Sequence, residues 1–316
     1  MSDLKCPDSS RDRDFLAGGG EMTRLVHSKD WTETPLGPIE AWPQSLRTTV
    51  SLCLASNFPI DIVWGPRNTQ IYNDGYRVVC GEGHPAILGM DFTVAWASAW
   101  PVIGEPFARA MAGESSFLEN QRIFIRRNGY LEETFFTFSF SPIRDETGGI
   151  GGLFHPVTET TATMLGERRT RAVRDLTMRL SAAKSADEVL VLAADTLASF
   201  DLDLPFVLFY QLERPDDGQP SYKLVAHTGL AAETPVSPAT LALDSAVPWP
   251  INDLIHSTSV AELKGLTGLF GGVPCGPYEE PCDAAFGSAL WLPGSDLPAA
   301  IMIAGASSRL PLNDVY

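Results

Sequence analysis

A helical stretch from residue 160 to residue 200 separates two blocks of short strands, and this division limits the possible folds more than any other feature. Short strands that follow one another with turns predict an antiparallel sheet, and each block is long enough to enclose its own core. A chain of 316 residues also exceeds the usual size of one domain. The sequence therefore predicts an α+β protein with two domains that are joined by a helix.

The helical stretch carries one apolar stripe. Its members are spaced like the a and d positions of a coiled coil over only two repeats, which is too short for a full coiled coil: Val173, Leu176, Leu180 and Ala183. Helices that connect two domains commonly pair across a dimer, so we expect a homodimer that uses this stripe. A second helix is predicted from Ser185 to Phe200, because Ser185-x-x-Glu188 is a capping box.

Five strands are predicted before the helical stretch. The clearest is at residues 134–141, where Phe136, Phe138 and Phe140 alternate with polar residues, as in a half-buried strand. Asn128-Gly129 is a strong hairpin signal. The five predicted ranges are 60–64, 69–73, 117–127, 134–141 and 150–157.

Helices are expected around these strands. One is predicted over residues 39–56, and Trp96 and Trp100 have helical spacing in the segment between the second and third strands. The first block is therefore predicted to be a five-stranded antiparallel sheet with covering helices.

The second block has fewer strand signals. Strands are predicted at residues 206–213, 222–228, 288–292 and 299–305, and a long stretch rich in Pro, Ala and Gly lies between the two pairs. This order predicts a second antiparallel sheet that is flanked by helices.

The charge of the chain argues against nucleic-acid binding. Its net charge is −16, from 39 acidic and 23 basic residues, and such a field repels a phosphate backbone. The basic residues at 168, 169, 171 and 174 are interpreted as a solvated helix face. No apolar run is long enough to cross a membrane, and the N-terminus lacks the apolar segment of a secretory signal. We therefore expect a cytoplasmic protein with neither nucleic acid nor membrane as a partner.

Motifs for catalysis and metal binding are missing from the sequence. The five cysteines and five histidines are irregularly spaced, without CxxC pairs. There is no GxxxxGK[ST] loop and no His-bearing helix followed by an ATP lid rich in Asn and Gly. We expect neither a metal site nor catalytic residues in this chain.

Five stretches follow one another in a fixed order along the first block. They are GGGEM at 18–22, DWTETPLGPIEAWPQSLRT at 30–48, WGPRNTQIYNDGYR at 64–77, GHPAILG at 83–89 and EETFFTFSFSPIRDETGGIGGLF at 132–154. In this order they resemble the PAS domains at the N-terminus of bacterial sensor histidine kinases, in particular a subgroup with an added N-terminal segment.

The second block carries three such stretches. LPFVLFY at 204–210, TGL at 228–230 and PAAIMIAGASSRLPLNDVY at 298–316 resemble the GAF domain that often follows this PAS domain. The resemblance implies an N-terminal extension at 1–45, a PAS domain at 46–158, a linker helix at 159–184 and a GAF-like domain at 185–316. It also implies a C-terminal helix after Tyr316 that this sequence does not include.

The function that the resemblance implies is the sensory input of a two-component signalling protein. Its output would be a downstream kinase domain that acts on a response regulator, with the linker helix as the relay. Two alternatives stay open from the sequence. One is a protein-interaction adaptor without a small-molecule ligand, and the other is the input module of a cyclase or a phosphatase.

A ligand pocket in the PAS-like domain would use the aromatic residues where its helices cover the sheet. Asn73, Asp74 and His84 would supply polar groups, although a plain aromatic core is the alternative interpretation. The candidate residues are Trp64, Tyr72, Asn73, Tyr76, His84, Trp96, Trp100, Phe136 and Phe138.

No cofactor is required by the sequence. A haem with His84 as its axial ligand and a non-covalently bound flavin both stay possible. Neither Cys53 nor Cys80 lies in the run that a photoactive flavin needs. Cys6 precedes the PAS–GAF pair as a bilin-binding cysteine would, but the second block lacks the Pro-Arg-x-Ser-Asp-Ile-Pro run of phytochromes.

Overall fold

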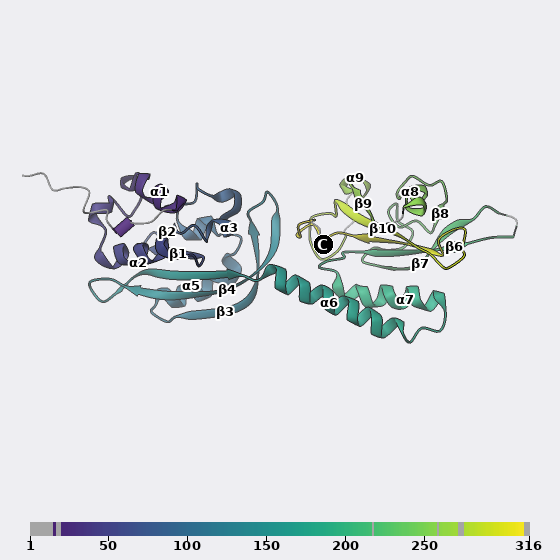
Figure 1. Cartoon of the computed structure of the whole chain (residues 1–316), viewed down its shortest axis with the longest axis horizontal. Coiled ribbons are helices and arrows are strands. Elements are labelled where there is room, and N and C mark those ends of the chain that lie inside the picture. Colours follow the sequence, from purple (N-terminus) through teal and green to yellow (C-terminus); the bar gives the residue numbers. More distant parts are fainter. Residues whose placement is uncertain (1–14, 17–19, 217, 258, 271–274, 313–316) are drawn as a thin grey trace, which may run out of the picture. The chain divides into compact units, whose positions relative to one another are not determined.

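A computed structural model describes residues 15–16, 20–216, 218–257, 259–270 and 275–312 of the chain. The chain forms two compact units, and it passes from one to the other within a single helix. Unit 1 covers residues 1–164 and unit 2 covers residues 165–316 (Figure 1). The predicted α+β class with two antiparallel sheets is confirmed.

Unit 1 contains a five-stranded sheet in the order β2-β1-β5-β4-β3. Every neighbouring pair is antiparallel, as predicted. The bounds are β1 Ile60–Trp64, β2 Thr69–Tyr72, β3 Ser116–Arg126, β4 Leu131–Arg144 and β5 Ile150–Glu159. All five lie where the sequence predicted strands, and β4 is longer at both ends because it pairs with β3 and with β5.

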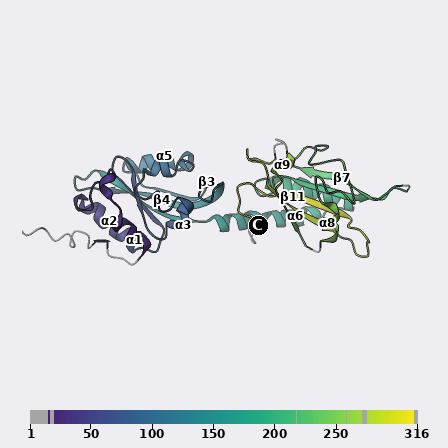
Figure 2. The ribbon, with the colours of Figure 1, turned by 90° about the horizontal axis from the view of Figure 1, so that it is seen from above.

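The helices of unit 1 are short. They are α1 Glu21–Ser28, η2 Trp31–Glu33, η3 Ile39–Ala41, α2 Gln44–Ala55, α3 Arg77–Cys80, η4 Gly81–Gly83, α4 Phe92–Ala95 and α5 Trp100–Met111. Helix α2 contacts β1 and β2, whereas α5 contacts β3, β4 and β5. Figure 2 shows these helices around the sheet from a second direction.

The prediction of a single helix over residues 39–56 is wrong in one respect. The chain is extended at Trp42, with φ −65° and ψ 135°, so a turn of η3 is separated from α2. The reason is Pro43, because a proline disfavours the helical conformation of the residue before it. Trp96 and Trp100 likewise do not share a helix, since Trp96 is the C-cap of α4 and α5 begins at Trp100.

Residues 20–45 share one hydrophobic core with the rest of unit 1. Trp31 and Trp42 are buried, with their rings 5.1 Å apart in a T-shaped arrangement. The amide groups of Glu21 and Met22 donate hydrogen bonds to Asp74 Oδ1 at 3.0 and 3.2 Å. Asp74 therefore caps α1 from a distant part of the sequence, because Gly20 at the N-cap has no side chain for this purpose.

Unit 2 contains a six-stranded antiparallel sheet in the order β8-β7-β6-β11-β10-β9. The strands are β6 Val207–Glu213, β7 Ser221–Thr228, β8 Thr240–Ala242, β9 Ala261–Lys264, β10 Ala284–Leu290 and β11 Ala300–Gly305. The helices are α6 Thr161–Leu180, α7 Ala186–Leu197, η5 Ala198–Phe200, α8 Ile251–His256 and α9 Thr267–Phe270.

The two faces of this sheet belong to different cores. On β6, Leu208 and Tyr210 pack on the face that also holds residues of α8 and α9. Val207 and Phe209 pack on the opposite face with residues of α6 and α7, which lie side by side (Figure 1). A central strand that is buried on both faces has a nearly continuous apolar sequence, which is why 206–213 was a clear strand signal.

Three features of unit 2 differ from the prediction. The strand predicted at 288–292 lies at 284–290, and β8 and β9 lie in the stretch predicted to be irregular. Strand β10 is Ala-Ala-Phe-Gly-Ser-Ala-Leu, a composition with weak strand propensity. Gly287 is needed there because a Cβ atom would lie 2.5 Å from Leu254 Cδ2 of α8. Helix packing across the sheet, which no local pattern shows, selects these small residues.

The predicted N-cap of α7 is confirmed. Ser185 Oγ accepts a hydrogen bond from the amide of Glu188 at 3.2 Å, and Glu188 Oε2 accepts one from the amide of Lys184 at 2.7 Å. Within the described ranges, no helix has both the length and the apolar composition needed to cross a membrane.

Replacing Gly20 with alanine tests the cap of α1. A Cβ atom would lie 1.8 Å from Asp74 Oδ2, so the carboxylate must leave its position. We expect Gly20→Ala to lower the free energy of unfolding of unit 1 by about 1–3 kcal/mol, measured by chemical denaturation. Gly166→Ala is the matched control, because its Cβ meets no atom within 4 Å and a helical alanine adds about 0.5–1 kcal/mol. Equal effects of the two variants would contradict this account.

Candidate functional site

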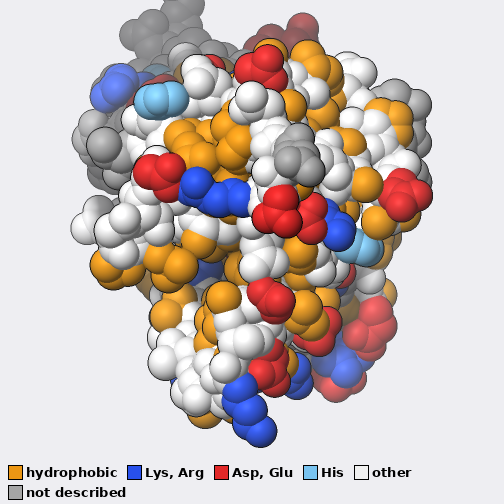
Figure 3. Space-filling view, turned by 90° about the vertical axis from the view of Figure 1, so that its right-hand side faces the viewer, with side chains coloured by type: hydrophobic (Ala, Val, Ile, Leu, Met, Phe, Trp, Pro, Cys, Tyr) orange, Lys and Arg blue, Asp and Glu red, His pale blue; other side chains and the backbone are white. Residues whose placement is uncertain are grey.

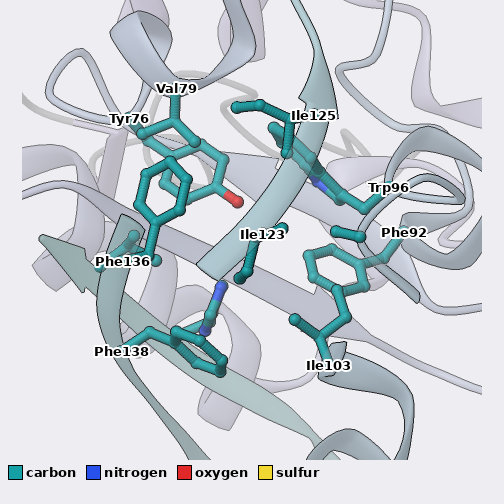
Figure 4. A pocket seen from close by; sticks show the side chains of 12 residues that line it. Tyr76, Val79, Phe92, Trp96, Ile103, Ile123, Ile125, Phe136 and Phe138 are labelled. Atoms are coloured by element: carbon teal, nitrogen blue, oxygen red, sulfur yellow. The ribbon is translucent and has the colours of Figure 1, made fainter. Parts of the chain in front are cut away.

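Unit 1 encloses a small apolar cavity between its sheet and its helices (Figure 4). Its volume is about 30 Å³, which is room for very few water-sized groups. Side chains from β3, β4 and β5 form one wall and those from α3, α4, α5 and their connections form the other. The lining residues are Tyr76, Val79, Phe92, Trp96, Ala99, Ile103, Ile123, Ile125, Phe136, Phe138, His155 and Val157.

Strand periodicity explains the sheet side of the cavity. Alternate residues of a strand point to the same face, so Phe136 and Phe138 share a wall with Ile123 and Ile125 of the neighbouring strand. Figure 4 shows these four side chains turned toward those of Phe92, Trp96 and Ile103. The hydroxyl oxygen of Tyr76 is turned toward the same space.

His155 is the polar member of this wall. Its ring stacks on Phe140 with centroids 4.2 Å apart, and Phe138 and Phe92 meet it edge to face at 5.5 and 5.8 Å. Nδ1 lies 2.9 Å from the carbonyl oxygen of Ser139, which can only accept, so Nδ1 carries the proton and donates. Nε2 is then an acceptor, and among the described residues it has no hydrogen-bond donor.

Burial keeps His155 neutral. Removal from water lowers its pKa from the ordinary value of 6.5 to about 4, although the hydrogen bond to Ser139 acts in the opposite direction. The ring can therefore accept a hydrogen bond at neutral pH but carries no charge.

Asp61 lies opposite His155 in the antiparallel pairing of β1 with β5. The two residues are cross-strand partners on β1 and β5, so their side chains share a face, and Asp61 is also paired with Tyr72 on β2. Its side chain is completely buried, and the backbone amides of Ile62 and Ile71 lie close enough to its carboxylate to lower the pKa, although neither makes a full hydrogen bond. Burial raises the pKa of Asp61 well above its ordinary value, which favours the protonated form. A buried carboxyl group that lacks a full hydrogen bond is rare in proteins and marks this face of the sheet.

The structure brings four of the nine predicted pocket residues together. Tyr76, Trp96, Phe136 and Phe138 line the cavity, whereas Trp64, Tyr72, Asn73, His84 and Trp100 do not. Trp100 packs over Gly104 on its own helix, and Trp64 packs on Gly151 and Gly152.

Asn73 has a purely structural set of partners. Its Nδ2 donates to the carbonyl oxygens of Cys53, Ser56 and Phe58 at 2.7–3.0 Å. Its Oδ1 accepts from the amides of Ile60 and Tyr76 at 3.1 and 3.0 Å. The side chain therefore fixes the backbone between α2 and β1 and offers no free group to a ligand.

Tyr72 and His84 connect the sheet to the N-terminal segment. The Tyr72 hydroxyl lies 2.9 Å from His84 Nδ1, and His84 Nε2 lies 3.2 Å from Glu21 Oε1. Glu21 also pairs with Arg77 at 2.9 Å. Both nitrogens of His84 are thus engaged outside the cavity.

The residues do not fit a haem or a flavin. A site for a ligand of that size has a volume of roughly 300–1,000 Å³, far above that of this cavity. His84, the predicted axial ligand, is engaged as described above, and His155 is held by Ser139 and Phe140. Cys6, considered for a bilin, lies outside the described residues.

Sequence reasoning missed His155 and Asp61. Both carried one usable signal, because each is a single titratable residue inside an otherwise apolar strand, in Ile-Asp-Ile-Val and in Leu-Phe-His-Pro-Val. Nothing in the sequence showed that these two strands are neighbours.

The start of α6 is bound directly to the cavity wall. The amide of Phe135 donates to Thr161 Oγ1 at 3.0 Å, and the Phe135 carbonyl accepts from the amide of Thr160 at 2.7 Å. Phe135 precedes Phe136, which lines the cavity. Arg127 bridges Glu132 and Glu159 with four hydrogen bonds of 2.7–2.9 Å, so β4 and the end of β5 are also joined by charge.

The predicted stripe on α6 is divided between two environments. Leu176 and Leu180 are partly buried against the core beneath α7, and they line a groove of about 400 Å³ within unit 2. Val173 lies at the same groove but is 65% exposed. Ala183 lies beyond the last residue of α6 and is half-buried.

In the part of the chain that the structure describes, no group of three or more His, Cys, Asp or Glu side chains is arranged to hold a metal ion. On the face shown in Figure 3, acidic and basic side chains are interspersed with apolar ones.

Comparison with known proteins shows distant likenesses only. No protein family and no curated protein matches the chain by sequence. Among solved structures, the GAF domain of an Acinetobacter phosphoenolpyruvate-protein phosphotransferase is 12% identical and has a TM-score of 0.34, with 46% of this chain and 81% of that chain covered. The chromophore-binding domain of a Stigmatella aurantiaca bacteriophytochrome is 14% identical, with a TM-score of 0.32 and coverage of 82% and 89%. A sensory box sensor histidine kinase from Vibrio cholerae is 13% identical, with a TM-score of 0.25 and coverage of 50% and 98%.

The pH dependence of stability tests the buried state of His155. Below about pH 6.5 the unfolded chain binds a proton that the folded protein does not bind until about pH 4. The contribution of neutral His155 to the free energy of unfolding is therefore fully present above pH 6.5. It falls by about 3 kcal/mol as the pH falls toward 4. We expect His155→Phe, which keeps the ring stack, to reduce this slope in denaturation curves. Parallel slopes for the two proteins would contradict the assignment.

Proposed function

We propose that this chain is the sensory input region of a bacterial two-component signalling protein, located in the cytoplasm, with a protein-histidine kinase as its output. The PAS-like and GAF-like sequence stretches support this proposal, as do two α+β units that are linked through one helix. The downstream partner in this scheme is a response regulator, which the kinase domain phosphorylates.

The observation that carries the proposal is the bonded path from the cavity to α6. Phe136 lines the cavity, and the adjacent Phe135 holds Thr160 and Thr161 through its carbonyl and its amide. A displacement of β4 therefore acts on the first turn of the helix without an intervening loop. A ligand shifts such an equilibrium by its difference in affinity for the two positions of the strand.

The chemistry of the cavity limits the ligand. The walls are apolar, and His155 Nε2 is a hydrogen-bond acceptor without a donor. The matching ligand is a small molecule of a few heavy atoms that is mainly apolar and donates one hydrogen bond. The Tyr76 hydroxyl is a second polar contact on the opposite wall.

Filling the cavity with a protein side chain tests the path. Val157→Phe adds a ring at the β5 wall, which we expect to push β4 and weaken the bonds at Phe135, at a cost of about 1–3 kcal/mol. Hydrogen exchange measured on the whole chain should become about tenfold faster for the amides of Phe135 and Thr160. Val191→Phe places the same change at an exposed position of α7 and should leave both amides unchanged.

The same hydrogen-exchange experiment in a Thr161→Val variant tests whether the effect passes through the bond between Phe135 and Thr161. Thr161→Val removes the acceptor of the Phe135 amide, so this amide should already exchange quickly and Val157→Phe should add little. Thr170→Val is the control, because its hydroxyl bonds only within α6. Unchanged exchange in Val157→Phe, or equal effects of the two threonine variants, would refute the path.

We also propose that α6 pairs with the same helix of a second copy. Val173 is the exposed member of the stripe, and Met178 is 61% exposed on the same helix. Substitutions at Leu176 and Leu180 test dimer formation less clearly, because a charge at either position would enter the core of unit 2.

Val173→Glu tests the dimer without disturbing the core. We expect the dissociation constant in sedimentation velocity to rise at least about tenfold, since two carboxylates would meet at the helix pair. Val260→Glu introduces the same charge at a position that is 60% exposed elsewhere in unit 2 and should have no effect. Equal masses for Val173→Glu and the parent protein would argue against pairing through α6.

One observation favours a second candidate function, the interaction adaptor. Three consecutive apolar residues at the end of β10 are exposed to solvent: Leu290 by 37%, Trp291 by 48% and Leu292 by 55%. Consecutive exposed apolar residues are typical of a protein-binding surface. An adaptor would leave the cavity empty, so the absence of any coupling between cavity and helix would favour this alternative.

A further inference from the structure

Two cysteines lie against each other in the core of unit 2. The sulfur atoms of Cys275 and Cys282 are 2.8 Å apart, and the amide of Cys282 donates a hydrogen bond to Cys275 Sγ at 3.0 Å. The residues are 3% and 1% exposed, so only a very small reagent reaches them. Both are free thiols in this structure.

The segment between the two cysteines is held in place from both sides. Gly276 has a φ of +75° and packs on Pro205, where a Cβ would lie 2.5 Å from Pro205 Cβ. Arg309 stacks on the Tyr278 ring at 4.2 Å and pairs with Glu280 at 2.9 Å. The fixed loop keeps the two thiols together without a covalent bond.

We propose that Cys275 and Cys282 form a reversible dithiol–disulfide site whose substrate is a small peroxide. This inference concerns unit 2 alone and does not depend on the proposed function.

The chemistry balances in two steps. The Cys275 thiol releases its proton, and the thiolate attacks one peroxide oxygen and breaks the O–O bond, so that a Cys275 sulfenic acid forms and the departing hydroxide takes up the released proton as water. The Cys282 sulfur then attacks the sulfur of Cys275, the S–O bond breaks, and the second water leaves with the proton of Cys282. Two thiols lose two electrons and two protons, and hydrogen peroxide takes up both to become two waters. A dithiol reductant reverses the change by thiol exchange.

The hydrogen bonds assign different roles to the two sulfurs. The neighbouring Cys282 sulfur and the Cys282 amide, which donates to Cys275 Sγ, lower the pKa of Cys275, whereas the Cys275 sulfur raises the pKa of Cys282. Since the thiolate is the nucleophile, Cys275 attacks the peroxide and Cys282 resolves the sulfenic acid.

Cys53 and Cys80 of unit 1 provide internal controls. Both are buried, and burial raises the pKa of each thiol. The Cys53 thiol donates to the carbonyl of Ile60, and the Cys80 thiol donates to that of Tyr76. Neither has the low pKa or the paired sulfur of Cys275, so both should react slowly.

Peptide mapping of the whole chain tests the proposal directly. The protein is treated with hydrogen peroxide, alkylated after unfolding and digested with trypsin, which cuts after Lys264 and Arg309 and at no residue between them. We expect the peptide 265–309 to lose two hydrogen atoms and to escape alkylation, while Cys53 and Cys80 stay alkylated. Dithiothreitol should restore both alkylation sites.

A second measurement distinguishes a disulfide bond from slow alkylation of the two thiols. Closing the loop should raise the midpoint of thermal unfolding of the oxidised protein by about 5 °C. Cys282→Ser should show no such rise and should instead accumulate a sulfenic acid on Cys275, whereas Cys53→Ser should behave as the parent. Full alkylation of both cysteines after peroxide treatment, or a mixed bond to a different cysteine, would overturn the proposal.

Discussion

Two hydrogen bonds to the backbone of Phe135 connect the sheet of unit 1 to helix α6, and the proposed signalling path depends on them. Because adjacent residues of a strand point to opposite faces, β4 can present Phe136 to the cavity and use the Phe135 backbone to hold the helix. The Arg127 bridge to Glu132 and Glu159 reinforces the same place. A change in the cavity and a change in the helix therefore act on one segment of backbone.

The cavity wall combines strong aromatic packing with polar groups that are costly to bury. His155 is stacked on Phe140 and is neutral, with Nδ1 bonded to Ser139, and the Asp61 carboxylate is buried without a full hydrogen bond in the described part of the chain. An ordinary core would replace both with apolar residues, because buried polar groups without partners lower stability. A ligand or a rearrangement that donated a hydrogen bond to either group would offset this cost.

Unit 2 has a different chemistry from unit 1. An apolar groove is formed by α6, α7 and the sheet, and two buried thiols lie on the opposite side of that sheet. Arg309 follows β11 and binds the loop between the cysteines, so the state of the sulfurs acts on the segment after the last strand. If both proposals hold, the two units respond to unrelated chemical signals.

The sequence by itself determined the α+β class, the five strands of unit 1, the helical connection and the cap of α7, because periodicity, turn residues and capping are local properties. The sequence also indicated four of the residues that line the cavity, because they are aromatic and belong to the helices and strands that cover one another. They are Tyr76, Trp96, Phe136 and Phe138. Only the tertiary structure decided the rest. Strand pairing placed Asp61 beside His155, a hydrogen-bond network assigned Asn73 to the backbone, and loop packing brought Cys275 to Cys282, because each of these contacts joins segments that no local pattern relates.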